Sequence, residues 1–393
     1  MFINLMKKII NFKSKNLIFL SVILSGLLLR IFMAKQGHSI DTEHFRFLAD
    51  YKKFNGHLWE FGSNGYGPIW VHVLYFLDKI YFFSLDEFYS LKWKIVIFLS
   101  IVDLFIFFLL FKNYSLTTAT LFFLNPISIY VTGFHNGFEN FAILIGFLAI
   151  ICYSKIKNDL GFVLCLILLG LSITTKHILF LLPLWLAIKE KTWLRKFLMA
   201  TIPVAIFLIS FLPWWSEESH FIIRHVFSYE SQNNGIFWSL FTPQFFNSYV
   251  GYKNLFIIAL FITGFIIERK DKLETFYLYL LCFFMFSAAT ANQYFSIPLI
   301  AIAVFFNSYF LIFSVCAFTF FLAEDTGLNL IELRELFNYT RNHIDFYYKI
   351  LVGIFVIGFI RNFLGPKKFY DYIKLIIKLI FEKIMNQIKS KLY

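Results

Sequence analysis

The sequence predicts an all-α fold, a polytopic bundle of about 12 helices that cross a membrane. Composition and the spacing of apolar runs lead to this prediction. Hydrophobic residues make up 59% of the 393 positions, and Phe alone accounts for 56 of them. Charged residues make up 15%, whereas a soluble domain carries about 25%. Such a chain meets lipid over much of its surface, and apolar runs of roughly 17–25 residues cross a bilayer as helices.

The first apolar run follows a basic N-terminal segment, MFINLMKKIINFKSKN. It is longer than the roughly 7–15-residue apolar region of a signal peptide, and no clear cleavage site follows it. We therefore interpret it as a retained span. The runs that we expect to cross the membrane, in chain order, are 17–34, 89–111, 116–133, 138–153, 159–175, 177–189, 196–213, 252–268, 273–291, 293–306, 309–323 and 346–364.

The segment 67–83 is also apolar, but the positive-inside rule predicts that it stays on the outer side. With the N-terminus inside, the basic clusters between spans then fall on the cytoplasmic side. If 67–83 crossed, every later loop would change sides and the rule would fail repeatedly. We therefore predict an integral protein of the plasma (inner) membrane with both termini cytoplasmic. Lys92 and Lys94 are exceptions, because they fall at the outer end of their span.

The net charge of +12 is explained by the cytoplasmic loops and tails. Because no basic patch lies on a soluble domain, nucleic acid is excluded as a partner. We divide the chain into a transmembrane domain, 1–366, with outer loops at 35–88 and 214–250, and a basic segment, 367–393. The spacing of Lys, Ile and Leu in that segment favours an amphipathic helix against anionic membrane lipid on the cytoplasmic side. A solvated tail is the alternative.

The predicted topology brings the unusual polar stretches to the outer face. These stretches are 35–66, 134–140, 174–177, 214–235 and 290–294. Ionisable residues at membrane depth are costly and commonly mark a functional site. We therefore expect an extracytoplasmic site.

Two acids, Asp41 and Glu43, follow the first span, with His44 next to them. A carboxylate held at the membrane edge can serve as a general base. The pair could also hold a divalent cation such as Mg or Mn, because hard cations take oxygen ligands. Ordinary loop acids are the third interpretation.

The other polar stretches offer further candidate residues. His135, Asn136 and Glu139 end one apolar run and begin the next, either as site residues or as a polar hairpin tip with a helix cap. Lys176 is either a cation for a phosphate group or a snorkelling residue, and His177 follows it. Basic and aromatic residues in 214–250 suit a phosphate and a sugar ring, or a lipid headgroup; they include Arg224, His225 and Tyr229.

These stretches, in this order, resemble the GT-C superfamily of membrane glycosyltransferases. Asp41-Thr42-Glu43 matches that superfamily's D-x-E form, and Tyr66-Gly67-Pro68 matches its Tyr-Pro-Pro-like motif imperfectly. Asn125-Pro126, Asn136 and Glu139 fit a stretch of the GPI-type mannosyltransferases, from which His135 and Gly137 depart. The run Asn292-Gln293-Tyr294-Phe295 is similar to the Pro-Gln-Tyr-Phe of that family, with Asn292 in place of Pro.

The resemblance implies re-entrant or interfacial helices in the first outer loop and an inverting transfer of a sugar, mannose or another hexose. The donor would be a polyprenyl-phosphate sugar and the acceptor a hydroxyl of a glycan, lipid or protein. Asp41 would be the base, and Tyr66, Gln293 and Tyr294 would contact substrate. The leaving phosphate would be stabilised by a metal held by Asp41 and Glu43 or by basic side chains, namely Lys92, Lys94, Lys176, Arg224 and His225.

Two other functions stay open at this point. A lipid-linked glycan polymerase or ligase would also work at the outer face, through Arg and His of the loop 214–250. A transporter or flippase of lipid-linked sugars would carry polar residues near mid-membrane. Asp103 is one of the few residues at that depth.

Overall fold

The computed structural model describes most of the chain, namely residues 2–50, 59, 65–81, 87–228, 237–238, 251–288, 291–324, 327–330, 332, 335, 343–375 and 378. Across these residues the elements are helices, and no strand occurs among them. The all-α prediction is therefore confirmed for the part of the chain that the structure describes.

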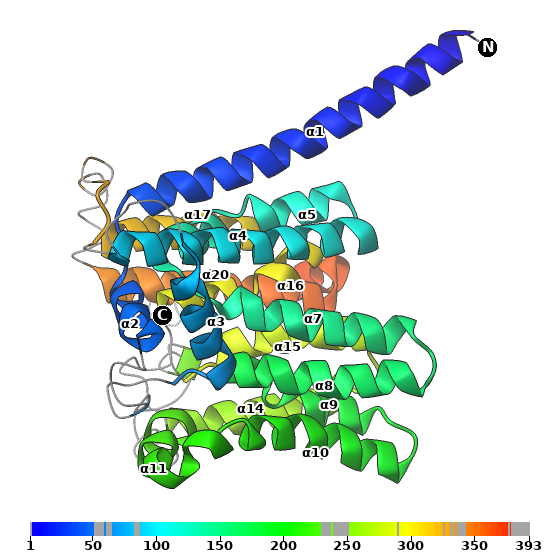
Figure 1. The fold of residues 1–393 in the computed structure, drawn as a ribbon. Coiled ribbons are helices and arrows are strands. Elements are labelled where there is room, and N and C mark those ends of the chain that lie inside the picture. The colour runs from blue at the N-terminus through cyan, green and yellow to red at the C-terminus, as the bar shows by residue number, and fades with distance from the viewer. Residues whose placement is uncertain are drawn as a thin grey trace, which may run out of the picture.

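Long apolar helices lie side by side and form the body of the protein (Figure 1). Each predicted apolar run is found as a helix or as a pair of shorter helices. In chain order the elements of the bundle are α1 (Phe2–Lys35), α4 (Glu87–Asn113), α5 (Leu116–Phe123), α6 (Pro126–Tyr130), η2 (Val131–His135), α7 (Glu139–Lys155), α8 (Asp159–Thr175), η3 (His177–Leu179), α9 (Leu182–Ile188), α10 (Trp193–Ile209), α11 (Leu212–Ile222), η4 (Ile223–Phe227), α14 (Tyr252–Ile266), α15 (Lys272–Phe286), η5 (Asn292–Ser296), α16 (Leu299–Val304), α17 (Ser308–Glu324) and α20 (Ile344–Leu364).

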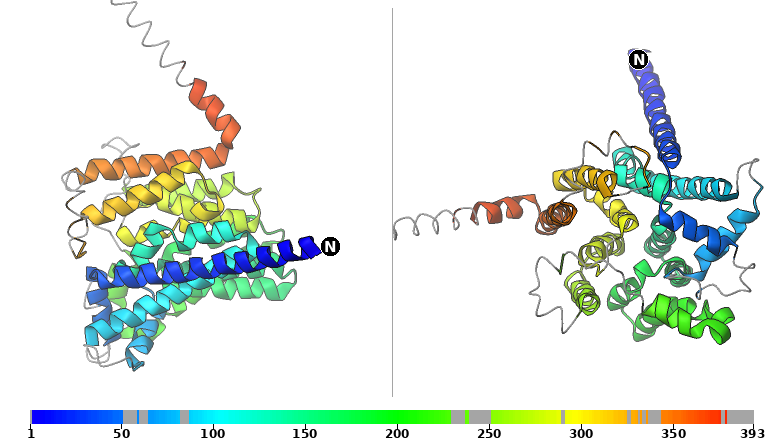
Figure 2. Two further views of the ribbon diagram at one scale, coloured as in Figure 1. Left: turned by 90° about the horizontal axis from the view of Figure 1, so that it is seen from above. Right: turned by 90° about the vertical axis from the view of Figure 1, so that its left-hand side faces the viewer.

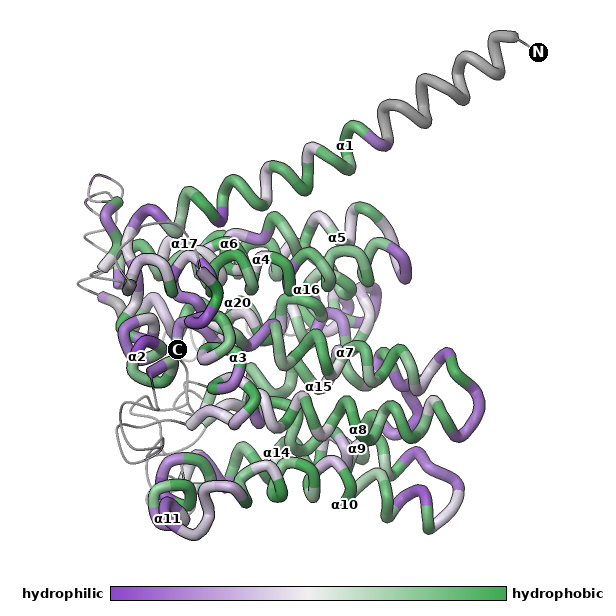
Figure 3. Tube along the Cα trace, viewed as in Figure 1, coloured by the Kyte–Doolittle hydropathy of each residue, from purple (hydrophilic) through white to green (hydrophobic). Residues whose placement is uncertain are grey.

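Two short helices follow α1 in the predicted first outer loop. They are α2 (Ile40–Ala49) and α3 (Pro68–Lys79), and both lie at the end of the bundle where α11 lies (Figure 1). The α7–α8 and α9–α10 turns, with their predicted cytoplasmic lysines, lie at the opposite end. Hydrophilic residues gather at both ends and hydrophobic residues between them (Figure 3). The described parts of the polar stretches lie at one end of the bundle.

The two chain ends leave the bundle at the end opposite α2. The N-terminal half of α1 stands away from its neighbours, and α20 leads into a further helical stretch, 366–375 (Figure 2). This stretch is the first part of the predicted basic amphipathic segment. The rest of that segment, apart from residue 378, lies outside the described residues. Which side of a membrane this end faces stays a prediction.

Three helices are long and apolar enough to cross a membrane on their own: Asn16–Lys35, Tyr89–Asn113 and Phe346–Leu364. Two bent pairs raise the number to as many as five. The other apolar helices are shorter, because polar residues or Pro interrupt them. The chain is therefore a helical membrane protein by composition and by helix length, and the count of about 12 crossings stays a prediction.

Pro126 breaks the run 116–133, as the sequence indicated. Asn125 caps α6 by accepting a hydrogen bond on its Oδ1 from the Ile127 backbone N–H, at 3.0 Å, and Pro126 takes the first helical position. The helices before and after this break are bent by 47°. The bend directs η2 toward the polar end of the bundle, where His135 ends it.

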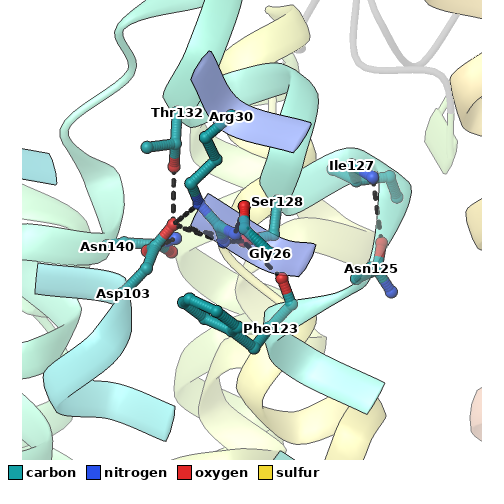
Figure 4. A network of polar contacts seen from close by, with 9 residues as sticks. All are labelled: Gly26, Arg30, Asp103, Phe123, Asn125, Ile127, Ser128, Thr132 and Asn140. Atoms are coloured by element: carbon teal, nitrogen blue, oxygen red, sulfur yellow. Dashed lines mark hydrogen bonds and ion pairs between the residues drawn. The ribbon is translucent and has the colours of Figure 1, made fainter. Parts of the chain in front are cut away.

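A buried ion pair between Arg30 of α1 and Asp103 of α4 holds the upper part of the bundle together (Figure 4). Both side chains have 0% exposure, and Arg30 Nη2 lies 2.8 Å from Asp103 Oδ2. Asp103 also accepts hydrogen bonds from Thr132 Oγ1 at 2.7 Å and from Asn140 Nδ2 at 2.8 Å. Arg30 also donates to the carbonyl oxygens of Gly26 and Phe123 and to Ser128 Oγ. One acid thus connects α1, α4, η2 and α7.

Candidate active site

Helix α2 carries Asp41 and Glu43 on different sides. It buries Thr42, Phe45, Leu48 and Ala49 against the bundle. Two residues apart on an α-helix means about 200° around its axis, so Asp41 and Glu43 cannot face the same partner. Glu43 Oε1 lies 3.1 Å from His38 Nε2, whereas Asp41 Oδ2 lies 3.5 Å from His135 Nδ1. The D-x-E motif thus lies within a helix, where its two acids point in different directions, and not in a loop.

Two hydrogen bonds connect the start of α2 to the end of η2. Ser39 Oγ donates to the backbone carbonyl of His135 at 2.9 Å, and Asn136 Nδ2 donates to Thr42 Oγ1 at 2.8 Å. Asn136 has φ 58°, in the left-handed region, where Asn is tolerated better than most residues. Its backbone turn directs the chain from η2 into α7. Asn136 is therefore a turn residue that also ties α2, and its side chain does not cap α7, whose N-cap is Phe138.

An aromatic cluster beneath the site packs α2, α3 and α7 together. The Phe138 ring stacks on Trp70 with centroids 4.2 Å apart, and it meets the Tyr66 ring edge-on at 5.2 Å. Phe45 contacts all three of these rings. Such pairs contribute about 0.5–1.5 kcal/mol each beyond the burial of their area. The cluster fixes the position of α2 relative to Glu139.

Lys176 and Glu139 form a second buried ion pair close to this cluster. Lys176 Nζ donates to Glu139 Oε1, and the two side chains are 6% and 0% exposed. Three rings surround the ammonium group, with centroids 4.6 Å (Phe138), 5.1 Å (Tyr294) and 5.7 Å (Tyr66) from Nζ. Glu139 Oε2 is buried without a hydrogen-bond partner among the described residues. Glu139 Oε2 can therefore accept a further hydrogen bond, and it lies next to the Lys176 ammonium group that the three rings surround.

The motif Tyr66-Gly67-Pro68 packs against the segment that carries Lys176. The Gly67 N–H donates to the Thr175 carbonyl at 3.3 Å. A Cβ on Gly67 would lie 1.6 Å from the Thr174 carbonyl oxygen, so only Gly allows this approach. The motif thereby brings the Tyr66 ring over Lys176. The sequence offered a turn before α3, but it gave no signal for this partner.

The segment η5, from a distant part of the chain, contributes Gln293 and Tyr294 to the site. A Cβ on Gly137 would lie 2.7 Å from Glu139 Oε2 and 2.9 Å from Gln293 Cβ, so Gln293 lies directly next to the η2–α7 turn. Tyr294 is one of the rings around Lys176. Residues from four distant stretches of the sequence therefore meet at one place, as the sequence predicted from their shared side.

A cavity of about 830 Å³ opens next to α2. Its lining is mixed, and it includes His38, Glu43, Lys92, Trp93, His135 and Asn292. Asp41 is not among the described residues that line it. His135 thus lines this cavity and also lies 3.5 Å from Asp41.

Lys92 and Lys94 have structural partners at the outer end of α4. Lys92 Nζ donates to the carbonyl oxygens of Ala34 and Gly37, at the C-terminal end of α1, where a cation is favoured by the helix dipole. Lys94 Nζ donates to the Asp78 carbonyl at 3.1 Å. These contacts explain the two exceptions to the charge rule without a lipid phosphate. Contact with substrate remains a prediction for both.

The remaining candidates lie around this centre. His44 is half-buried on α2, and His177 is half-buried at the start of η3. Arg224 and His225 lie in η4, and no hydrogen bond or ion pair between described residues joins them to Asp41, Glu43 or Lys176. Tyr229 lies outside the described residues. The structure therefore groups Asp41, His135, Glu139, Lys176 and Tyr294, and it leaves η4 apart from them.

The side chains do not fit a divalent cation held jointly by Asp41 and Glu43. The two carboxylates have separate partners, and the described residues contain no group of three or more His, Cys, Asp or Glu side chains that could hold a metal. A requirement for a divalent cation, Mg or Mn, stays a prediction, which a chelator tests.

Comparison with known proteins gives structural neighbours only. No protein-family model matches the sequence, and no curated protein matches it. The fold is similar to crystal structures of ArnT from Cupriavidus metallidurans in the apo state (TM-score 0.49) and bound to undecaprenyl phosphate (TM-score 0.46). In both, the identity is 11%, and the match covers 90% of this chain and 78% of ArnT.

Proposed function

We propose that this protein is a membrane glycosyltransferase that takes a sugar from a polyprenyl-phosphate carrier and transfers it to an acceptor hydroxyl. One observation carries the proposal: the Asp41–His135 pair and the Lys176–Glu139 pair lie at the two ends of the η2–α7 turn, at the polar end of an apolar helix bundle. A base and a cation next to a lipid-facing surface are what this reaction needs.

The proposed roles follow from the contacts. The Asp41 end of the site accepts the proton of the acceptor hydroxyl, whose oxygen attacks the anomeric carbon. The bond from that carbon to the phosphate oxygen breaks, and the phosphate leaves with the electron pair. Lys176 lies next to this phosphate and stabilises its charge, because charge-assisted hydrogen bonds are stronger than neutral ones. Attack opposite to the leaving group inverts the anomeric centre.

The apolar helices suit the carrier lipid, and the polar residues suit the sugar. Gln293 lies next to the η2–α7 turn, and the Tyr66 ring centroid lies 5.7 Å from Lys176 Nζ, so both are candidates to contact the sugar. We propose a hexose, with mannose as the first candidate, because of the motifs shared with the GPI-type mannosyltransferases. We also propose that the site faces the extracytoplasmic side of the plasma membrane, as the loop charges indicate.

A donor panel tests the function directly. Purified protein in lipid nanodiscs is incubated with polyprenyl-phosphate hexoses and hydroxyl acceptors, and products are followed by mass spectrometry. The expected result is consumption of one donor with release of free polyprenyl phosphate. Transfer of a whole glycan from a polyprenyl diphosphate would instead indicate a ligase. Passage of an intact lipid-linked sugar across sealed vesicles would indicate a flippase.

Neutralising either partner of the Lys176–Glu139 ion pair tests whether Lys176 contacts the phosphate. Lys176→Gln should raise the donor KM about 10- to 100-fold, the loss of one charge-assisted hydrogen bond. Glu139→Gln should not raise it, because Lys176 would then be free to pair with the phosphate. Steady-state kinetics with the identified donor measure both values. A rise in KM of similar size in both variants would mean that the pair only supports the fold.

A further inference from the structure

The contact between Asp41 and His135 indicates which of the two side chains can reach a molecule in the cavity, and the motifs did not show this. His135 Nδ1 faces Asp41 Oδ2 at 3.5 Å and is sealed from solvent without a closer hydrogen-bond partner. The His135 side chain as a whole is 9% exposed, and this residue lines the 830 Å³ cavity. The accessible edge of the ring is therefore the one away from Asp41. That edge carries Nε2.

We infer that His135, with Asp41 behind it, is the base that contacts the acceptor hydroxyl. This inference rests on the proposed function and changes which atom accepts the proton. The Asp41 side chain is 21% exposed but does not line the cavity, so an acceptor bound in the cavity contacts the imidazole rather than the carboxylate. Separations in catalytic pairs are commonly long before substrate binds, so 3.5 Å is compatible with a working contact.

The proton transfer follows from this arrangement. When substrate binding shortens the 3.5 Å separation, Asp41 Oδ2 accepts the Nδ1–H of His135, and this fixes the tautomer whose Nε2 lone pair is free. Nε2 takes the hydroxyl proton as the acceptor oxygen forms its bond to the anomeric carbon and the bond to the phosphate oxygen breaks. The resulting imidazolium lies next to the Asp41 carboxylate, which stabilises it. The departing phosphate carries away the electron pair, and Nε2 later releases the proton to water.

The backbone keeps the ring in this position independently of its side-chain chemistry. Ser39 Oγ donates to the His135 carbonyl, and Asn136 is held through Thr42. A replacement side chain at 135 therefore leaves these two bonds in place. The cavity also suits a polar acceptor, because Glu43, His38 and Asn292 line it together with Trp93. Sugar hydroxyls would pair with the polar groups, and a sugar face would pack on the indole.

A double-mutant cycle tests the order of the two residues. His135→Asn keeps an amide donor near the position of Nδ1 but has no base at the position of Nε2. It should lower kcat at least about 100-fold with the donor KM unchanged. Adding Asp41→Asn should cause little further loss, because residues that act as one unit are not additive. His135→Gln is the second variant, and thermal unfolding in detergent checks that each protein is folded.

Two results would overturn the inference while the proposed function stands. In the first, wild-type protein transfers sugar, Asp41→Asn does not, and His135→Asn keeps its rate within about threefold. In the second, the losses of the two single variants multiply in the double variant, so that the residues act independently. Failure of the function itself is separate, because wild-type protein would then consume no polyprenyl-phosphate sugar at all.

Discussion

Asp41→Asn is expected to lower kcat for sugar transfer about 100- to 10,000-fold, the range that general-base assistance contributes. The amide has the size of the carboxylate but takes up no proton, and it does not hold the tautomer of His135 that a base needs. The two hydrogen bonds that tie α2 to η2 come from Ser39 and Asn136, so the fold should persist. Single-turnover assays with a radiolabelled donor measure the effect, because they separate the chemical step from product release.

Asp159→Asn is the matched control for this experiment. Asp159 lies in the first turn of α8, at the opposite end of the bundle, and its side chain is 93% exposed. The same chemical change there should leave transfer unchanged within about twofold, since exposed ion pairs contribute little. A wild-type rate in Asp41→Asn would remove Asp41 from the mechanism. Equal losses in the two variants would trace the effect to folding or insertion.

The helical fold could be predicted from the sequence because apolar run length and loop charge report directly on it. The breaks within the spans were partly visible, as at Pro126, where a helix must lose a hydrogen bond. The number of crossings could not be tested by helix length alone, because runs such as 293–306 divide into short helices, here η5 and α16. The resemblance implied helices in the first outer loop, and α2 begins there at Ile40. The residues of 36–47 did not themselves indicate where that helix begins.

The sequence predicted that the polar stretches lie on one side, but it did not predict which side chains contact each other. Charge counting assigned Asp41, His135, Glu139 and Lys176 to one side of the membrane. It could not show that Asp41 meets His135 rather than Glu43, because this depends on the helical twist of α2. Nor could it show that Gly67 brings Tyr66 over Lys176 through contact with Thr174. Contacts between residues so far apart in the sequence leave no local signal in one sequence.

Only one partner of the Arg30–Asp103 ion pair was recognised in the sequence. Asp103 stood out as an acid at membrane depth, whereas Arg30 was counted within the apolar run 17–34. An arginine in such a run calls for a partner, because a charge without one is costly in lipid. That reasoning would have connected the two spans. The structure adds that Asp103 also holds Thr132 and Asn140, which flank the His135–Glu139 turn.

Asp103→Ala is therefore expected to be the most damaging single change to stability. It leaves the Arg30 guanidinium buried without its counter-ion and removes the acceptor of Thr132 and Asn140. Removing one partner of a buried pair costs about 3–5 kcal/mol, much of it from the charge that remains. Unfolding followed by near-ultraviolet circular dichroism in mixed micelles of increasing denaturing-detergent fraction measures the loss.

The double variant Arg30→Met, Asp103→Leu separates charge from packing. It removes both charges and fills most of the same volume, so it should be more stable than Asp103→Ala alone, because replacing a whole buried pair by apolar groups is often close to neutral. If the double variant instead lost the sum of the two single effects, the pair would contribute no coupling energy. Sugar transfer by the double variant adds a second measurement. Since Thr132 and Asn140 would lack their common acceptor, a stable protein with a lowered kcat would mean that Asp103 positions the His135–Glu139 turn for reaction.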